Sequence, residues 1–134
     1  MTISHSKTLL VILQNAWGVS DGYYPSYDVP SFANSLTGKR LKWALPDNCK
    51  ITITNASGLV GETADSVFPA DIEHIRAAIR RYKPDAILAC GVIARQAFTK
   101  IKTKKPIVFM SHPAHRCFSK MIAEAAKCEL EGLL

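Results

Sequence analysis

The chain has 134 residues, of which 48% are apolar and 21% are charged. These values exclude a disordered or fibrous protein and suit one globular domain, which we expect to span residues 1–134. The net charge of +6 favours a phosphate-rich partner, although a basic surface that only aids solubility explains the charge equally well.

Membrane and secretory signals are weak. The longest apolar run, LLVIL at 9–13, is too short to cross a bilayer, and no small-residue cleavage site follows it. We therefore expect neither a membrane span nor a signal peptide. The four cysteines form no CxxC pair, which predicts buried, reduced thiols in a cytoplasmic protein: Cys49, Cys90, Cys117 and Cys128.

Four short apolar runs follow one another along the chain. They are TLLVIL (8–13), the β-branched KITIT (50–54), DAILAC (85–90) and PIVFM (106–110). Runs of this length predict strands, and their nearly continuous apolar character is typical of strands that are covered on both faces.

Helical patterns separate these strands. We expect a first helix capped by Thr37 and ended by Pro46, and a second that begins at Pro69 and ends before Pro84. VIARQAF (92–98) predicts a short third helix, and a last one should run from Ser119 to about Leu130. Repeated strand–helix units predict an α/β protein, a three-layer α/β/α fold with a four-stranded, mainly parallel sheet.

Polar residues follow three of the four predicted strands. The exits read QNAWG (14–18), NASG (55–58), Gly91 and SHPAHR (111–116). Ligands of open parallel sheets bind at the carboxyl ends of the strands, so these residues should meet at one edge. Gly91 suits a tight turn, and each polar residue taken singly suits a structural role. Together, two amides, a histidine and an arginine beside the aromatic loop 17–32 indicate a pocket that recognises a nucleobase.

A metal site is the weaker interpretation of the fourth exit. His112, His115 and Cys117 are chemically suitable ligands, but this spacing lacks a second pair of ligands. We therefore expect no metal and no other cofactor.

The motifs resemble those of the uracil-DNA glycosylase superfamily, from about Leu9 to Ile122. LQNAW (13–17) is similar to the family's Gly-Gln-Asp-Pro-Tyr, and HPAHR (112–116) is similar to His-Pro-Ser-Pro-Arg. SLTGKRL (35–41), ITITNAS (51–57) and YKPDAILACGVIARQAF (82–98) resemble the family's intervening segments in the same order. The chain departs from the family at Asn15, which replaces an acid, and at Ala114, which replaces a serine.

The resemblance implies a monofunctional DNA glycosylase that acts in DNA repair, flipping out uracil or a related altered base and hydrolysing its N-glycosidic bond. It implies catalytic roles for His112, which would stabilise the leaving base, and for Asn15, which would orient water. An amide cannot act as a general base near neutral pH, so catalysis should be slow.

Further roles follow from the same resemblance. The base would contact Gln14, Trp17, Phe32 and Asn55. The resemblance and the basic clusters of the sequence together indicate which residues contact DNA. We expect these to be Arg116, His115, Lys39, Arg40, Lys102, Lys104 and Lys105. We expect a monomer. Two alternatives remain open, a non-catalytic DNA-binding protein on the same fold and an enzyme that acts on a small nucleotide or nucleobase.

Overall fold

A four-stranded sheet forms the centre of the protein. The computed structural model describes residues 7–14, 16–17, 36–47, 49–57, 60–61 and 69–134. The strands of the sheet are β1 (Lys7–Leu13), β3 (Cys49–Asn55), β5 (Ala86–Cys90) and β6 (Ile107–Met110), in the order β3-β1-β5-β6. All three strand pairs are parallel.

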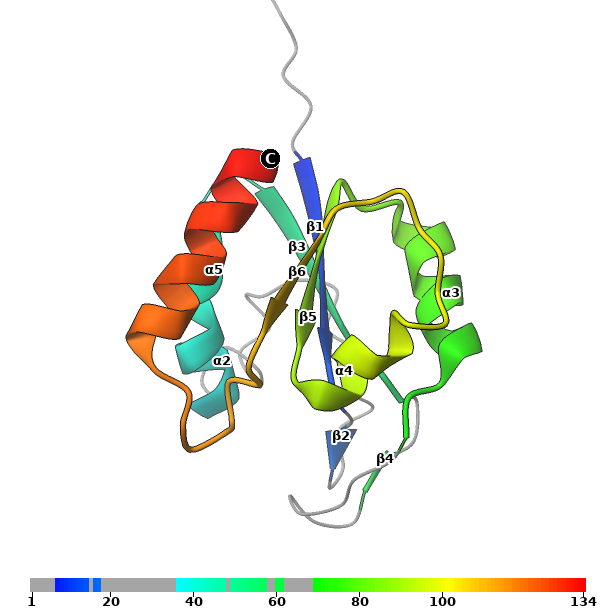
Figure 1. Cartoon of the computed structure of the whole chain (residues 1–134), viewed down its shortest axis with the longest axis horizontal. Helices are drawn as coiled ribbons and strands as arrows, with labels where there is room; N and C mark the ends of the chain where they lie inside the picture. Colours follow the sequence, from blue (N-terminus) through cyan, green and yellow to red (C-terminus); the bar gives the residue numbers. More distant parts are fainter. Residues whose placement is uncertain (1–6, 15, 18–35, 48, 58–59, 62–68) are drawn as a thin grey trace, which may run out of the picture.

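Helices cover both faces of this sheet (Figure 1). On one face lie α2 (Leu36–Leu41), its short 3₁₀ continuation η1 (Lys42–Ala44) and α5 (Lys120–Leu133). On the other face lie α3 (Ile72–Tyr82) and α4 (Val92–Ala97). The predicted three-layer α/β/α fold is therefore confirmed. No helix in the described part of the chain is long and apolar enough to cross a membrane.

A second, small sheet lies beyond the end of β1. It consists of β2 (Ala16–Trp17) and β4 (Val60–Gly61), which pair in parallel. Each of these strands follows a strand of the main sheet, β2 after β1 and β4 after β3.

The central strand β1 shows why the apolar runs are continuous. Leu9, Val11 and Leu13 pack into the core beneath α2 and α5, whereas Leu10 and Ile12 pack into the core beneath α3 and α4. Successive side chains of a strand point to opposite faces, so a strand covered on both sides needs apolar residues at every position. All five of these side chains are buried.

Two helix starts differ from the sequence-based expectation. The α3 helix begins at Ile72 rather than Pro69, because the Asp71 side chain accepts a hydrogen bond from the His74 N–H at 3.1 Å and caps the helix. The α2 helix begins at Leu36, which places Thr37 inside the helix instead of at its cap. Ser119, where the last helix was expected to start, is the cap of α5, since its hydroxyl accepts from the Ile122 N–H at 3.2 Å.

The cysteines are all free, but they do not share one environment. Cys90 is buried, as expected, and burial raises the pKa of its thiol far above the ordinary value. Cys49 is partly buried, whereas Cys117 and Cys128 are exposed. The expectation of four buried thiols was therefore wrong, because Cys117 lies in a surface turn and Cys128 on the outer side of α5.

Candidate functional site

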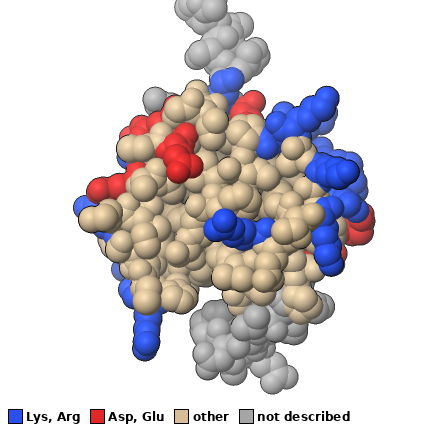
Figure 2. Space-filling model, in the orientation of Figure 1, with Lys and Arg blue, Asp and Glu red and all other residues tan. Residues whose placement is uncertain are grey.

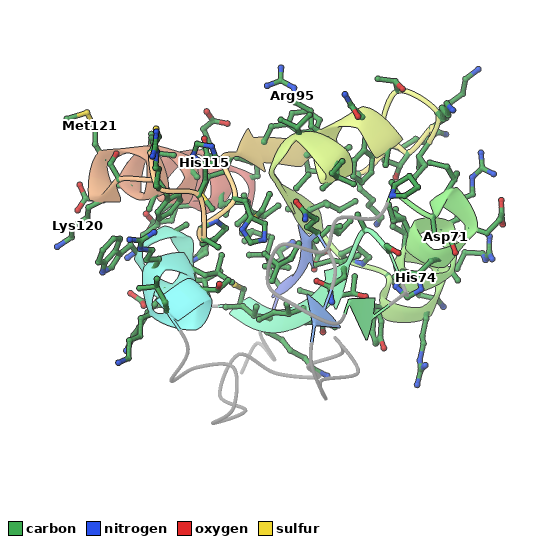
Figure 3. All side chains as sticks on the ribbon, turned by 90° about the horizontal axis from the view of Figure 1, so that it is seen from below. Asp71, His74, Arg95, His115, Lys120 and Met121 are labelled. Carbon is green, nitrogen blue, oxygen red and sulfur yellow. The ribbon has the colours of Figure 1, made fainter. Side chains whose placement is uncertain are left out.

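The carboxyl ends of the four parallel strands form one edge of the sheet, which Figure 3 views directly. The chain passes from β1 to β3 on one side of β1 and then continues at β5 on the other side. Loops leaving β1 and β5 therefore diverge, and such a reversal of strand order is where open α/β sheets bind ligands. Gln14 and Gly91 follow these two strands, and Asn55 and His112 lie at the ends of their neighbours.

Backbone hydrogen bonds hold the exits of β1 and β3 together. The Ala56 N–H donates to the Leu13 carbonyl at 2.8 Å, and the Ser57 N–H donates to the Gln14 carbonyl at 3.0 Å. Asn55, opposite Leu13 in the register, is 6% exposed. We expected Asn55 to follow the strand, but it is the last residue of β3 and is buried. Its amide is thus part of the packed sheet edge as well as a candidate for binding a base.

A backbone hydrogen bond also joins the exits of β5 and β6. The Gly91 N–H donates to the Met110 carbonyl at 2.7 Å. Gly91 has a φ of 90°, and a Cβ added there would lie 3.2 Å from the Cβ of His112. Only glycine combines this backbone conformation with so near a neighbour. The predicted structural role of Gly91 is confirmed, and that role is to let β5 end against His112.

The imidazole of His112 is held in one chemical form. Its Nδ1 accepts a hydrogen bond from the Ala114 N–H at 3.0 Å. Burial and the nearby His115 lower the pKa of His112 to about 4. The ring is therefore neutral near pH 7, and because Nδ1 is the acceptor, the single ring proton lies on Nε2. His112 offers a neutral hydrogen-bond donor at the sheet edge.

The segment from His112 to Phe118 forms two successive turns of the same kind. The His115 N–H donates to the His112 carbonyl, and the Phe118 N–H donates to the His115 carbonyl, both at 2.9 Å. Within the second turn, the Nδ1 of His115 accepts from the Cys117 N–H at 3.1 Å, repeating the arrangement at His112. Each histidine thus fixes its own turn.

Side chains from α2 and η1 anchor these turns. Arg40 donates from Nη1 to the Pro113 carbonyl at 3.1 Å and to the His115 carbonyl at 3.4 Å. The buried ring of Phe118 stacks on Trp43, with centroids 6.5 Å apart. We expected Arg40 to contact DNA, but its guanidinium is engaged with the backbone of the turn that carries His112.

The structure separates the remaining basic residues into two groups. Lys39 on α2, and His115 and Arg116 in the turns, are exposed near the carboxyl edge. In contrast, Lys102, Lys104 and Lys105 belong to the segment that leads into the start of β6, at the amino edge. Parallel strands begin at one edge and end at the other, so these lysines do not join His112 in one surface. The residues that we expect to contact DNA are thus divided between two edges of the sheet, and their contacts with DNA stay predictions.

Several predicted site residues lie outside the described part of the chain. These are Asn15 and Phe32, and the same holds for the side chain of Trp17, although Trp17 is part of β2. Their roles stay predictions. Within the described residues, no group of three or more histidines, cysteines and acidic residues could hold a metal ion.

Sequence reasoning overlooked a polar contact next to this edge. The hydroxyl of the buried Thr54 lies 3.3 Å from Nε2 of His74, in the first turn of α3. Figure 3 shows His74 and its cap residue Asp71 across the molecule from His115. The spacing of Asp71 and His74 is a recognisable capping signal, but the contact with Thr54 depends on how α3 packs on β3 and has no local signal.

No model of a known protein family matches the chain. A search of curated proteins likewise finds no match. The interpretation of the site therefore depends on its own residues and their geometry.

Proposed function

We propose that the chain is a monofunctional DNA glycosylase that excises uracil or a related altered base by hydrolysing the N-glycosidic bond. The observation that carries the proposal is the state of His112. Its imidazole is neutral, is fixed through Nδ1 by the Ala114 N–H, and bears its proton on Nε2 at the carboxyl edge of a parallel sheet. This is the form of histidine that can donate a hydrogen bond to a carbonyl oxygen without first gaining a proton.

The chemistry of the reaction explains why this form is useful. A base inside the duplex cannot be reached, so it must first rotate out of the stack. The bond between C1′ of the sugar and the base nitrogen then breaks, and its electron pair leaves with the base. Negative charge spreads to the base oxygens, where the Nε2–H of His112 donates a hydrogen bond. The oxygen of a water molecule bonds to C1′, and the proton that this water releases passes through solvent to the base anion, which leaves as the neutral base.

Asn55 supports the same proposal. A primary amide carries an acceptor oxygen and donor hydrogens, which match the adjacent carbonyl and N–H groups of a uracil edge. The side chain lies in a buried part of the sheet edge, where little water competes for hydrogen bonds with a base.

The remaining roles in this proposal rest on the motif resemblance. Phe32 stacks on the flipped base, Trp17 and Gln14 line its pocket, and Asn15 orients the attacking water. Arg116 fills the gap left in the base stack. Because Asn15 cannot accept a proton, the proposed enzyme works slowly and relies on His112 more than a carboxylate-containing enzyme would.

The test is incubation of the protein with oligonucleotides that carry uracil and other altered bases, in single strands and in duplexes, followed by alkaline cleavage at abasic sites. Cleavage by wild type that is lost in His112→Ala supports the proposal. An absence of abasic sites across the panel, with tight DNA binding, indicates a non-catalytic DNA-binding protein. Release of free base or sugar only from mononucleosides or nucleotides indicates a small-molecule enzyme.

A further inference from the structure

A second basic surface lies away from the candidate site, on the side of the molecule formed by α3 and the segment 98–106. We call it the basic flank. All of its cations are exposed, and they are contributed by the C-terminal end of α3 and by the segment that leads into β6: Arg80, Arg81, Lys83, Lys100, Lys102, Lys104 and Lys105. Figure 2 shows most Lys and Arg side chains of that view on this side of the molecule.

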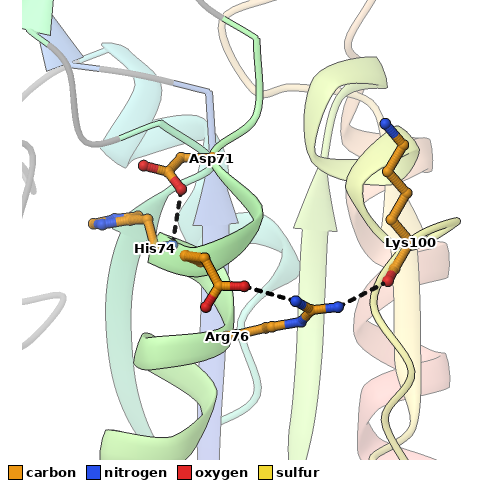
Figure 4. Close-up of polar contacts among 5 residues, drawn as sticks. Asp71, His74, Arg76 and Lys100 are labelled. Carbon is orange, nitrogen blue, oxygen red and sulfur yellow. Dashed lines mark hydrogen bonds and ion pairs between the residues drawn. The ribbon is translucent and has the colours of Figure 1, made fainter.

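The two parts of the basic flank are fixed side by side. Arg76 of α3 donates from Nη2 to the Lys100 carbonyl at 3.3 Å and from Nη1 to Glu73 at 2.7 Å (Figure 4). Beneath them, Ile79 of α3 and Ile101 belong to the same apolar core. The cations therefore sit on a packed scaffold, so a partner would not need to order a loose tail before it binds.

Little negative charge opposes these cations. Glu73, the one acid in α3, forms an ion pair with Arg76. Asp85 accepts a hydrogen bond from the Thr8 N–H at 2.8 Å, and segment 98–106 contains no acid. Glu124, Glu129 and Glu131 belong to α5, which covers the other face of the sheet. The flank therefore carries a net positive charge. None of its residues has a proposed catalytic role.

Apolar side chains give no sign of a membrane contact here. One exposed aromatic residue lies beside the flank: the ring of Phe109 packs against Phe98 of the segment 98–106, with centroids 6.3 Å apart, and lies beneath the Arg95 guanidinium. The other exposed large apolar residues in the described part of the chain belong to α2, η1, α4 and α5: Leu36, Trp43, Val92, Met121 and Leu133. A surface that enters the lipid interface usually inserts several such residues beside its cations. A dense set of cations beside a single, already packed ring suits a partner whose charge is regular and entirely exposed, as in a phosphodiester backbone.

We propose that the basic flank binds the sugar–phosphate backbone of a nucleic acid, independently of the carboxyl-edge site. The segment 98–106 leads into the start of the four-residue strand β6, whereas His112 follows its end, so the two surfaces face different directions. A backbone held by the flank need not be the stretch that presents a base to His112. Such a surface would keep the protein on nucleic acid without any requirement for sequence or damage.

The experiment measures binding of a short unmodified DNA duplex, and of the RNA duplex of the same sequence, at several salt concentrations. The test variant combines Lys102→Gln, Lys104→Gln and Lys105→Gln. The control combines Lys50→Gln, Lys120→Gln and Lys127→Gln, which remove the same charge from β3 and α5. Each phosphate contact that is lost should make the negative slope of log K against log salt shallower by roughly 0.9. We expect a reduced slope and roughly tenfold weaker binding for the flank variant, and a slope near wild type for the control.

Equal effects of the two variants would overturn the proposal, because net charge alone would then account for binding. So would binding to vesicles of equal parts phosphatidylserine and phosphatidylcholine without binding to either duplex. If the flank variant loses affinity for only one of the two duplexes, that duplex identifies DNA or RNA as the partner. This result also supports the proposal that the flank binds nucleic acid. Base excision is not needed for any of these outcomes, since the duplexes contain no altered base. Failure of the glycosylase assay therefore leaves this inference standing.

Discussion

Gly91 and His112 are so close that a Cβ added to the glycine would lie 3.2 Å from the Cβ of the histidine. The backbone of Gly91, with φ 90° and ψ 172°, also lies in a region that is essentially restricted to glycine. We predict that Gly91→Ala lowers the free energy of unfolding by about 1–3 kcal/mol. Because His112 must shift to relieve the contact, the variant should also change its imidazole NMR signals. Denaturant titration and proton–nitrogen spectra of the ring measure the two effects.

Gly132→Ala is the matched control for this substitution. Gly132 lies in α5, and a Cβ added there meets nothing within 4 Å. Replacing a helical glycine by alanine should leave stability unchanged or raise it by up to about 1 kcal/mol. If both variants were equally stable and His112 kept its signals in each, Gly91 would have no special relationship to the histidine.

Stability should fall in mild acid because of His112. Its pKa in the folded protein is about 4, below the ordinary value of 6.5, so between these values the unfolded chain binds more protons than the folded one. Stability is therefore full above pH 6.5 and decreases as the pH falls toward 4, by roughly 3 kcal/mol in total. The measurement is unfolding by denaturant at a series of pH values.

The variant His112→Gln tests the origin of that loss. Glutamine does not titrate, so the pH dependence between 6.5 and 4 should become shallower by the contribution of His112 alone. A direct check is the NMR titration of the wild-type ring, which should stay neutral, with its proton on Nε2, until the pH approaches 4. A ring that gains a proton near pH 6.5 would contradict the lowered pKa and remove the basis for a neutral donor.

Arg40 should act on His112 through the backbone. Its guanidinium donates to the carbonyls of Pro113 and His115, and these bonds hold the turn in which Ala114 fixes the imidazole. Arg40→Ala should loosen the turn and raise the pKa of His112 toward its ordinary value. The neighbouring Lys39→Ala, which is exposed, should leave that pKa unchanged and only weaken DNA binding. If Arg40→Ala instead altered only the salt dependence of DNA binding, Arg40 would be assigned a contact with a phosphate.

The strands were predictable because burial on both faces requires continuous apolar runs, and β1 and β5 have them. The helix start at Asp71 was harder to predict. Proline is tolerated at several positions near a helix N-terminus, whereas the side chain that caps the His74 N–H decides where the helix begins. The sequence-based expectation relied on Pro69 and did not consider Asp71 as the cap.

The surface that each residue reaches was harder to predict from the sequence. Lys105 and His112 are seven positions apart in the sequence, yet the strand β6 runs between them and puts them at opposite edges of the sheet. A strand rises by about 3.3 Å per residue, so even four residues are enough to separate two surfaces. The bond from Ala114 to His112 was equally hidden, because it depends on the orientation of one side chain and on a turn with no glycine.

His112 should act in the chemical step itself. If His112 donates a hydrogen bond to the leaving base, His112→Ala should lower the single-turnover rate of base excision by roughly 10²–10³, the effect of removing one such donor. The affinity for DNA that contains the altered base should change little, because the negative charge develops only as the bond breaks. The control is His115→Ala, which removes an exposed imidazole from the adjacent turn and should affect affinity rather than rate.

Asn15 completes this comparison. Asn15→Ala should slow the chemical step by removing the group that orients water, whereas Asn15→Asp should speed it, because a carboxylate stabilises the cationic sugar and can accept the proton of the water. Single-turnover rates for all four variants on one altered-base duplex decide the assignment. Wild-type rates in both His112→Ala and Asn15→Ala would place the chemistry elsewhere in the protein. A loss in His112→Ala that Asn15→Asp does not share would assign the stabilisation of the leaving base to the imidazole that Ala114 holds.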